Sequence, residues 1–324
     1  MTTESTDQES FAATVQPFRD ELRVHCYRML GSYQDAEDAV QETLLAAWRN
    51  LGAFEHRSSL RTWLYRIATN QCLNARRSSS RREARESGVP PMPLPQPTRM
   101  GEIFWLEPMP DAAVGATDDS RPDVRYEQSE SISLAFVTAL QHLPPRQVAV
   151  LLLRDVLGFR ASEVAEMLDA TVDSVNSALK RARAGLRGLR GGDGPAEPPA
   201  PGSPAENDVV ARFVSAYEAG DLDGLVGLFT DDVFFSMPPL PHEYQGRDPV
   251  GEFFARLFAV GRVYRTVPTR ANGQPAFGLY ARAADGVFHG TGFMVLTLAD
   301  EQIAALSRFE TTVLPWFGLP RSLR

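Results

Sequence analysis

The chain has 324 residues, of which 43% are hydrophobic, and a formal net charge of −8. This length exceeds that of one average domain, so more than one folding unit is expected. Its longest strongly apolar run, residues 148–153, is far too short to cross a bilayer, and the polar stretch MTTESTDQES does not resemble a signal peptide. The sequence therefore predicts a cytosolic protein with no membrane partner.

Two stretches of biased composition divide the chain into three expected folding units. Residues 78–125 pass from Ser/Arg-rich to Pro-rich to acidic, a composition typical of a flexible linker that cannot fold alone. Residues 191–206 are rich in Pro, Gly and Ala, which indicates an extended tether. Folded units are therefore expected at residues 11–77, 126–190 and 207–324.

The first unit is expected to be helical. Ser32, with Asp35 three residues later, is typical of a capping box, and apolar residues then follow at spacings of three and four up to Leu51. One helix face therefore faces a core. The opposite face carries four polar residues: Asp35, Asp38, Gln41 and Glu42. The pattern alone favours a solvated face whose acids offset the helix dipole.

A second amphipathic pattern covers residues 54–77. Its arginines and asparagines fall largely off the apolar stripe, beside Trp63. Guanidinium groups next to aromatic rings suit melted or single-stranded nucleic acid, although a basic helix face alone is more often plain soluble surface. Cys26 and Cys72 fall at apolar positions of helical patterns, which predicts core thiols rather than zinc ligands or a disulfide.

Residues 161–190 indicate a helix-turn-helix. An amphipathic helix at 161–168 is followed by a three-residue turn and a second helix from Val172, with Thr171 as its N-cap. Residues 132–190 hold 8 basic and 5 acidic residues, so this segment is positive although the chain is acidic. The polar residues expected to face DNA are Thr171, Ser174, Asn176, Ser177, Lys180, Arg181 and Arg183.

The order of these motifs resembles the extracytoplasmic-function (ECF, group 4) sigma factors of the sigma-70 family. DAEDAVQETLLAAW and SSLRTWLYRIATNQCLNARR are similar to region 2, and the stretch from LPPRQVAVLLLRDVLGF to LKRARAGLR is similar to region 4. The resemblance implies that Asp35, Asp38, Gln41 and Glu42 bind the beta-prime clamp helices of the bacterial RNA polymerase core. The acidic face then becomes a partner face.

The resemblance also implies promoter DNA as a second partner. Region 4 would read the −35 element through the residues given above, although Asn176 and Ala178 stand where many relatives carry Lys and Arg. Residues 78–125 would run through the polymerase towards the RNA exit path, where the acids of this segment could occupy a nucleic-acid channel by mimicry; an ordinary spacer is the alternative. Region 2 would read and melt the −10 element through Arg57, Ser58, Ser59, Arg61, Trp63, Arg66, Asn70 and Asn74.

Residues 207–324 continue past the point where such sigma factors normally stop. Two helical patterns, a strand, a Pro-rich loop, a helix after Gly246–Asp248 and alternating strand patterns resemble the SnoaL-like domains, cone-shaped α+β folds related to ketosteroid isomerase. The expected fold class is thus two all-α sigma domains plus one α+β domain. Polar residues that could line a C-terminal pocket are Asp232, His242, Tyr244, His289 and Glu310.

The role of this domain is left open between three alternatives: catalysis, ligand binding in a vestigial pocket, and intramolecular regulation through contact with the sigma domains. No acid/base pair stands out, so no catalytic residue, cofactor or metal is expected, and regulation is the favoured alternative. For the whole chain, the alternative to a non-enzymatic sigma factor is a SnoaL-type enzyme or small-ligand sensor that carries a DNA-binding arm.

Overall fold

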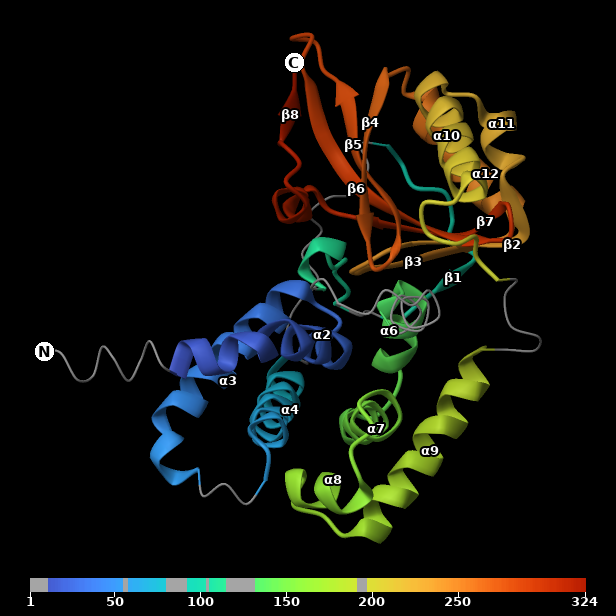
Figure 1. The fold of residues 1–324 in the computed structure, drawn as a ribbon. Helices are drawn as coiled ribbons and strands as arrows, with labels where there is room; N and C mark the ends of the chain where they lie inside the picture. The colour runs from blue at the N-terminus through green and yellow to red at the C-terminus, as the bar shows by residue number, and fades with distance from the viewer. Residues whose placement is uncertain (1–10, 55–57, 80–91, 103–104, 115–131, 191–196) are drawn as a thin grey trace, which may run out of the picture. The chain divides into compact units, whose positions relative to one another are not determined.

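The computed structural model, drawn as a ribbon in Figure 1, forms two compact units. The residues that it describes are 11–54, 58–79, 92–102, 105–114, 132–190 and 197–324. The first, here called the helical unit, falls within residues 1–82, 112–121 and 130–192. The second, here called the α+β unit, falls within residues 83–111, 122–129 and 193–324.

Three long helices form the first part of the helical unit: α2 (Arg19–Leu30), α3 (Tyr33–Arg49) and α4 (Leu60–Ser79), with short 3-10 turns η1 (Gln16–Phe18) and η2 (Leu51–Ala53). The Ser32 hydroxyl accepts a hydrogen bond from the Asp35 amide at 3.0 Å, which confirms the predicted N-cap of α3. Cys26 and Cys72 are buried free thiols, as predicted. Burial and the neighbouring Cys26 thiol raise the pKa of Cys72.

The second part of the helical unit contains α6 (Leu134–Gln141), α7 (Pro145–Leu151), the π-type turn η4 (Leu152–Val156), α8 (Ala161–Met167) and α9 (Val172–Arg190). The predicted helix-turn-helix is confirmed as α8 and α9. The Thr171 hydroxyl accepts the Ser174 amide at 3.2 Å, and Val175, Leu179 and Ala182 bury one face of α9. The opposite face of α9 is thereby left to solvent.

The α+β unit is built on one eight-stranded sheet with the order β1-β3-β2-β7-β6-β5-β4, and β8 pairs with β6. The β2–β7 pair is parallel and the other pairs are antiparallel. The strands are β1 (Arg99–Met100), β2 (Phe229–Met237), β3 (Leu240–Gln245), β4 (Tyr264–Ala271), β5 (Gln274–Arg282), β6 (Phe288–Ala299), β7 (Gln302–Phe309) and β8 (Ser322–Leu323).

Helices α10 (Pro204–Ala219), α11 (Leu222–Val226) and α12 (Arg247–Ala259) lie against one face of this sheet (Figure 1). Their buried aromatic rings form the core with the strands; Phe254, for example, packs edge-on against Tyr217 and at a tilt against Phe229 and Phe235. Two further 3-10 turns are η3 (Asp111–Ala113) and η5 (Thr311–Phe317).

The structure differs from the sequence-based expectation in three places. The segment around His242, expected as a Pro-rich loop, forms β3, because its backbone pairs with β2 on one side and β1 on the other. Helix α10 begins at Pro204 behind the N-cap Ser203, inside the segment expected as a tether. Part of the segment expected as a flexible linker, residues 92–102 and 105–111, belongs to the α+β unit.

Candidate functional site

Helix α3 presents an acidic face. Asp38, Gln41 and Glu42 are exposed and Asp35 is half-buried, while Ala36, Ala39, Val40 and Thr43 are buried on the other side. One turn beyond Glu42, and two turns beyond Asp38, lies Leu45, whose side chain is 42% exposed. An apolar side chain next to the acids is the kind of surface that a protein partner can cover. Leu45 was not predicted, because only the polar residues of this helix face were considered as partner contacts.

The outward side of α4 carries part of the set expected to contact the −10 element. Arg66, Asn70 and Asn74 are exposed, at spacings that place them on one helix face. Trp63 stacks on Phe54, with ring centroids 4.8 Å apart. Ser58 and Ser59 are exposed just before the helix, whereas Arg57 lies outside the described residues.

Arg61 lies on a different side of α4. Its guanidinium donates to Glu21 of α2 at 3.0 Å and lies 4.9 Å from the Tyr65 ring centroid. The Tyr65 hydroxyl donates to the same carboxylate at 3.2 Å. Arg61 is therefore held against α2, apart from the outward face of Arg66, Asn70 and Asn74.

The exposed face of α9 carries the whole set expected to contact the −35 element, namely Thr171, Ser174, Asn176, Ser177, Lys180, Arg181 and Arg183. Arg183 forms a two-pronged ion pair with Asp155 of η4, at 2.7 and 2.8 Å. Lys180 and Arg181 are exposed on the same helix. Hydroxyl, amide and cationic groups on a capped, amphipathic second helix can contact base edges and phosphates in a major groove.

Residues from the expected linker are bound tightly by the α+β unit. The Met109 amide donates to Asn272 Oδ1 at 2.9 Å, and the Asn272 amide donates back to the Met109 carbonyl at 3.0 Å. Asn272 lies in the β4–β5 turn with φ 58°, in the left-handed region. Leu106 and Met109 are buried. This segment is thus fixed by reciprocal backbone and side-chain bonds.

Two further contacts hold the same segment. The Asp111 carboxylate accepts the Gly273 amide at 2.7 Å and forms an ion pair with Arg270, which also binds the buried Glu206 at 2.9 Å. Burial raises the pKa of Asp111, against the opposing effects of Gly273 and Arg270. Just before β1, the Thr98 amide and hydroxyl both donate to the Glu243 carbonyl. We call residues 92–102 and 105–111 the docked linker.

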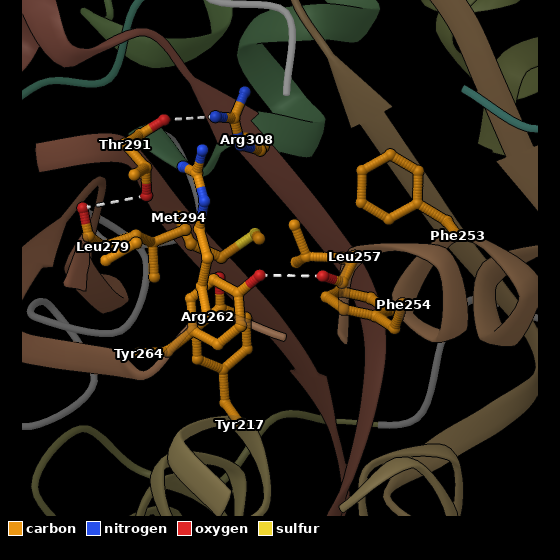
Figure 2. A pocket seen from close by; sticks show the side chains of 11 residues that line it. Tyr217, Phe253, Phe254, Leu257, Arg262, Tyr264, Leu279, Thr291, Met294 and Arg308 are labelled. Carbon is orange, nitrogen blue, oxygen red and sulfur yellow. Dashed lines mark hydrogen bonds between the residues drawn. The ribbon is translucent and has the colours of Figure 1, made fainter. Parts of the chain in front are cut away.

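A cavity of about 20 Å³, roughly the room one water molecule requires, lies inside the α+β unit and is drawn in Figure 2. Its lining is mainly aromatic and aliphatic, with polar members Tyr217, Arg262, Tyr264, Thr291 and Arg308. Arg308 is buried and donates to the Thr291 carbonyl, as the dashed line in Figure 2 shows. Burial lowers the pKa of this guanidinium.

The residues expected to line a C-terminal pocket are not among the lining residues of this cavity: Asp232, His242, Tyr244, His289 and Glu310. The Tyr244 hydroxyl donates to the Pro95 carbonyl of the docked linker at 3.1 Å. His289 is exposed and lies 3.2 Å from the Asp285 carboxylate. Glu310 is half-buried, and burial raises its pKa although Arg308 opposes this.

Within the described parts of the chain, no group of three or more His, Cys, Asp or Glu side chains could hold a metal ion. No helix among the same residues is long and apolar enough to cross a membrane.

Comparisons with known protein families agree with the order of these elements. Residues 14–82 match sigma-70 region 2, residues 133–186 match sigma-70 region 4, and residues 210–306 match the SnoaL-like domain. The three matches follow the chain in the order helical bundle, helix-turn-helix, α+β domain.

Curated relatives extend this likeness to most of the chain. The ECF RNA polymerase sigma factor SigG of Mycobacterium tuberculosis is 44% identical over 323 residues, which cover 97% of this chain and 85% of SigG. SigJ of the same organism is 29% identical, covering 75% of this chain and 71% of SigJ. Among solved structures, crystalline M. tuberculosis SigJ superposes with a TM-score of 0.59 at 22% identity, over 95% of this chain and all of that one, which is a likeness of fold.

Proposed function

This chain belongs to the ECF RNA polymerase sigma factors, with a C-terminal SnoaL-like domain, and we propose that it brings polymerase core to promoters through three exposed helix faces. This proposal rests on the exposure of those faces. Every described residue assigned to polymerase or promoter contact on α3, α4 and α9 is exposed or half-buried. The opposite faces of the same helices are buried in the protein core.

Helix α3 is the proposed polymerase-binding element. Asp38, Gln41 and Glu42 form an exposed acidic face, and Leu45 adds an apolar contact beside it. A charged rim around an apolar side chain favours a protein partner over nucleic acid, since phosphates repel carboxylates. The proposed partner surface is the beta-prime clamp helices of the core.

Helices α4 and α9 are the proposed promoter readers. Arg66, Asn70, Asn74 and the Trp63–Phe54 stack offer cationic, amide and aromatic groups to the −10 element. The exposed face of α9, from Thr171 to Arg183, would enter the major groove at the −35 element. Since Arg61 is engaged by Glu21, we assign it no base contact in this arrangement.

The α+β unit is the proposed regulator of these helices. Its support is the docked linker, because the segment that joins region 2 to region 4 is bound by Asn272, Arg270 and Glu243 of the C-terminal domain. A domain that binds the connection between two promoter-reading regions can change the range of positions they reach. We propose that docking of this segment sets the transcriptional output of the chain.

Run-off transcription with purified bacterial core polymerase and the full chain tests the main proposal. Template start sites mapped across a genomic library should share two elements upstream of the start. A matched reaction with Lys180→Ala and Arg181→Ala combined should lose the upstream element preferentially. Failure of the wild-type chain to bind core polymerase would refute the proposal.

A further inference from the structure

The cavity drawn in Figure 2 is lined by a buried positive charge. Arg308, near the end of β7, is 8% exposed, and its guanidinium donates to the Thr291 carbonyl of β6. The guanidinium lies over Gly292, where an added Cβ atom would come within 2.9 Å of Nη2 and 3.0 Å of Cζ. A side chain at position 292 would displace the guanidinium, so Gly292 leaves the room that Arg308 occupies.

Arg262 brings a second guanidinium to the same cavity. It lies in the loop between α12 and β4, and it both lines the cavity and is exposed to solvent. A residue with both properties marks the mouth of the cavity. Beside it in the same loop, Val260 and Val263 are 39% and 53% exposed. The mouth therefore combines one positive charge with exposed apolar side chains.

The lining as a whole has a positive side and an apolar side. Within the part of the chain that the structure describes, it includes two arginines and no Asp or Glu. Figure 2 shows the guanidinium groups of Arg262 and Arg308 on one side of the cavity, and Phe253, Phe254 and Leu257 on the other. Two positive charges between walls of low dielectric constant favour an anion, and the opposite wall suits an apolar group on the same ligand.

The hydroxyl groups of the lining narrow the choice of anion. The Tyr264 hydroxyl donates to the Leu257 carbonyl at 2.8 Å, and the Thr291 hydroxyl donates to the Leu279 carbonyl at 3.3 Å. Because both hydroxyls donate within the protein, the guanidinium groups are the main donors to a ligand. A planar guanidinium matches a carboxylate through two parallel hydrogen bonds. A monocarboxylate also brings a single charge to a mainly apolar lining, whereas a phosphate monoester would bring about two.

A ligand larger than water requires one lining side chain to move, because the cavity has a volume of about 20 Å³. Arg262 can move at the least cost, since exposed side chains change rotamer rapidly. It also follows Gly261, which has φ 72° and lies in the left-handed region. Outward rotation of Arg262 would extend the cavity to its mouth while Arg308 stays in place.

We propose that this cavity is a binding site for a small apolar monocarboxylate, with Arg308 as the group that binds the carboxylate. The tail of the ligand lies against Phe253, Phe254 and Leu257, and Arg262 closes the mouth over it. The site gives the α+β unit a chemical input. It requires neither polymerase nor DNA, so it goes beyond the proposed function and is testable on the free chain.

Methyl NMR on the full chain, labelled with ¹³C at its eight methionine methyl groups, tests the site. Met294 lines the cavity, and Met294→Leu assigns its resonance. The probes are benzoate and hexanoate, with benzamide and hexanamide as neutral counterparts of similar shape. At least one acid should shift the Met294 resonance saturably with a Kd below about 10 mM. Its amide should bind at least roughly tenfold more weakly, because it offers no charge to the guanidinium groups.

Variants of Arg308 locate the carboxylate. Arg308→Met removes the charge at similar length and should weaken acid binding roughly tenfold or more, without changing amide binding. Arg308→Lys keeps the charge and should restore part of the loss. Arg282→Met is the matched control: it removes an exposed arginine at the end of β5, outside the cavity lining, and should leave both affinities unchanged.

A second variant keeps the test decisive if Arg308→Met loses cooperative thermal unfolding. Arg262→Gln changes an exposed side chain and should weaken acid binding about threefold; an unchanged affinity then overturns the site. Equal affinity for acids and amides, a Met294 resonance that neither acid moves, or unchanged acid affinity in a folded Arg308→Met chain would each overturn it as well. Failure of the chain to bind core polymerase would refute the proposed function, while this measurement still decides the cavity.

Discussion

The helical unit and the α+β unit place their functional charged side chains in opposite ways. On α3 and α9 most of the charged groups face solvent, where they can exchange water for a partner. In the α+β unit, Arg270 pairs with both Glu206 and Asp111, and Asp111 belongs to the protein's own linker. The difference supports the proposal that the helical unit binds other molecules, whereas these charged groups of the α+β unit hold a segment of the protein's own chain.

Charge reversal on α3 gives the largest effect expected from this comparison. Asp38→Arg combined with Glu42→Arg should weaken core-polymerase binding about 100-fold, or about 2.7 kcal/mol, because like charges would then face each other across the interface. Stability should change little, since both sites are exposed. Binding is measured by fluorescence anisotropy with labelled chain.

The matched control makes the same charge change on the other unit. Asp223→Arg combined with Glu301→Arg alters two exposed acids of the α+β unit and should leave core affinity unchanged. Equal affinities for both double variants would mean that the acidic face of α3 is ordinary solvated surface.

Release of the docked linker is the next largest effect. Asn272→Ala removes the side-chain acceptor of the Met109 amide and puts Ala at φ 58°, so docking should weaken by about 2 kcal/mol. Hydrogen exchange at Leu106–Asp111 should accelerate about 30-fold, and run-off transcript yield should change. Both the faster exchange and the changed yield are expected because the segment between regions 2 and 4 is freed.

Asp300→Ala provides the control for backbone strain. Asp300 has φ 48° in the β6–β7 turn of the same sheet and does not contact the docked linker through any described bond. If Asp300→Ala accelerates exchange at Leu106–Asp111 as much as Asn272→Ala does, general loosening of the sheet accounts for the effect.

His25 sharpens the comparison, because it is a titratable side chain that is buried in the helical unit, unlike the exposed charged groups of α3 and α9. Burial, assisted by Arg28 and Arg61, lowers the pKa of His25 from 6.5 to about 3. Between these pH values the unfolded chain binds a proton that the folded chain does not, so stability decreases as pH falls from about 6.5 towards 3.

The expected slope from this one residue is at most about 1.4 kcal/mol per pH unit. Urea unfolding from pH 7 to pH 4 should show a shallower loss of stability for His25→Gln than for the wild type, since glutamine does not titrate. Identical pH profiles for the two chains would show that His25 is not responsible.

The smallest effects are expected on α9. Lys180→Ala should weaken binding to a −35 duplex by less than tenfold and reduce the slope of log affinity against log salt by about 0.9. Arg183→Ala should cost less, because Asp155 already neutralises part of its charge. A larger loss for Arg183→Ala than for Lys180→Ala in salt titrations would overturn this ranking.

Local patterns predicted the helices well because their determinants lie within a few residues of each other. Ser32 and Thr171 cap α3 and α9 through amides three positions away, and the apolar spacing identifies the buried faces. The region 2 and region 4 assignments depend on such local motifs. Their exposed faces could therefore be derived from sequence as the complement of the core stripe.

Contacts across long sequence separations were not predictable in this way. The Tyr244 hydroxyl bonds to Pro95, 149 positions away, and Arg61 bonds to Glu21, 40 positions away. No periodicity in either segment specifies such a partner. Docking of the linker and the inward position of Arg61 therefore became visible only in the structure. The predicted C-terminal pocket residues rested on chemical type alone, whereas Arg308 reaches the cavity because it lies two positions after Leu306 and shares the buried face of β7.

The docked linker has a consequence for the order in which the protein is made. Its residues precede region 4 in the chain, but Asn272, Arg270 and Glu243, which bind them, are translated near the end. At about 5–20 residues per second, the segment from 193 to 324 takes roughly 7–26 s to synthesise. During that interval the binding surface for the linker is incomplete, so every newly made molecule begins with its linker unbound, before the domain proposed as its regulator has formed.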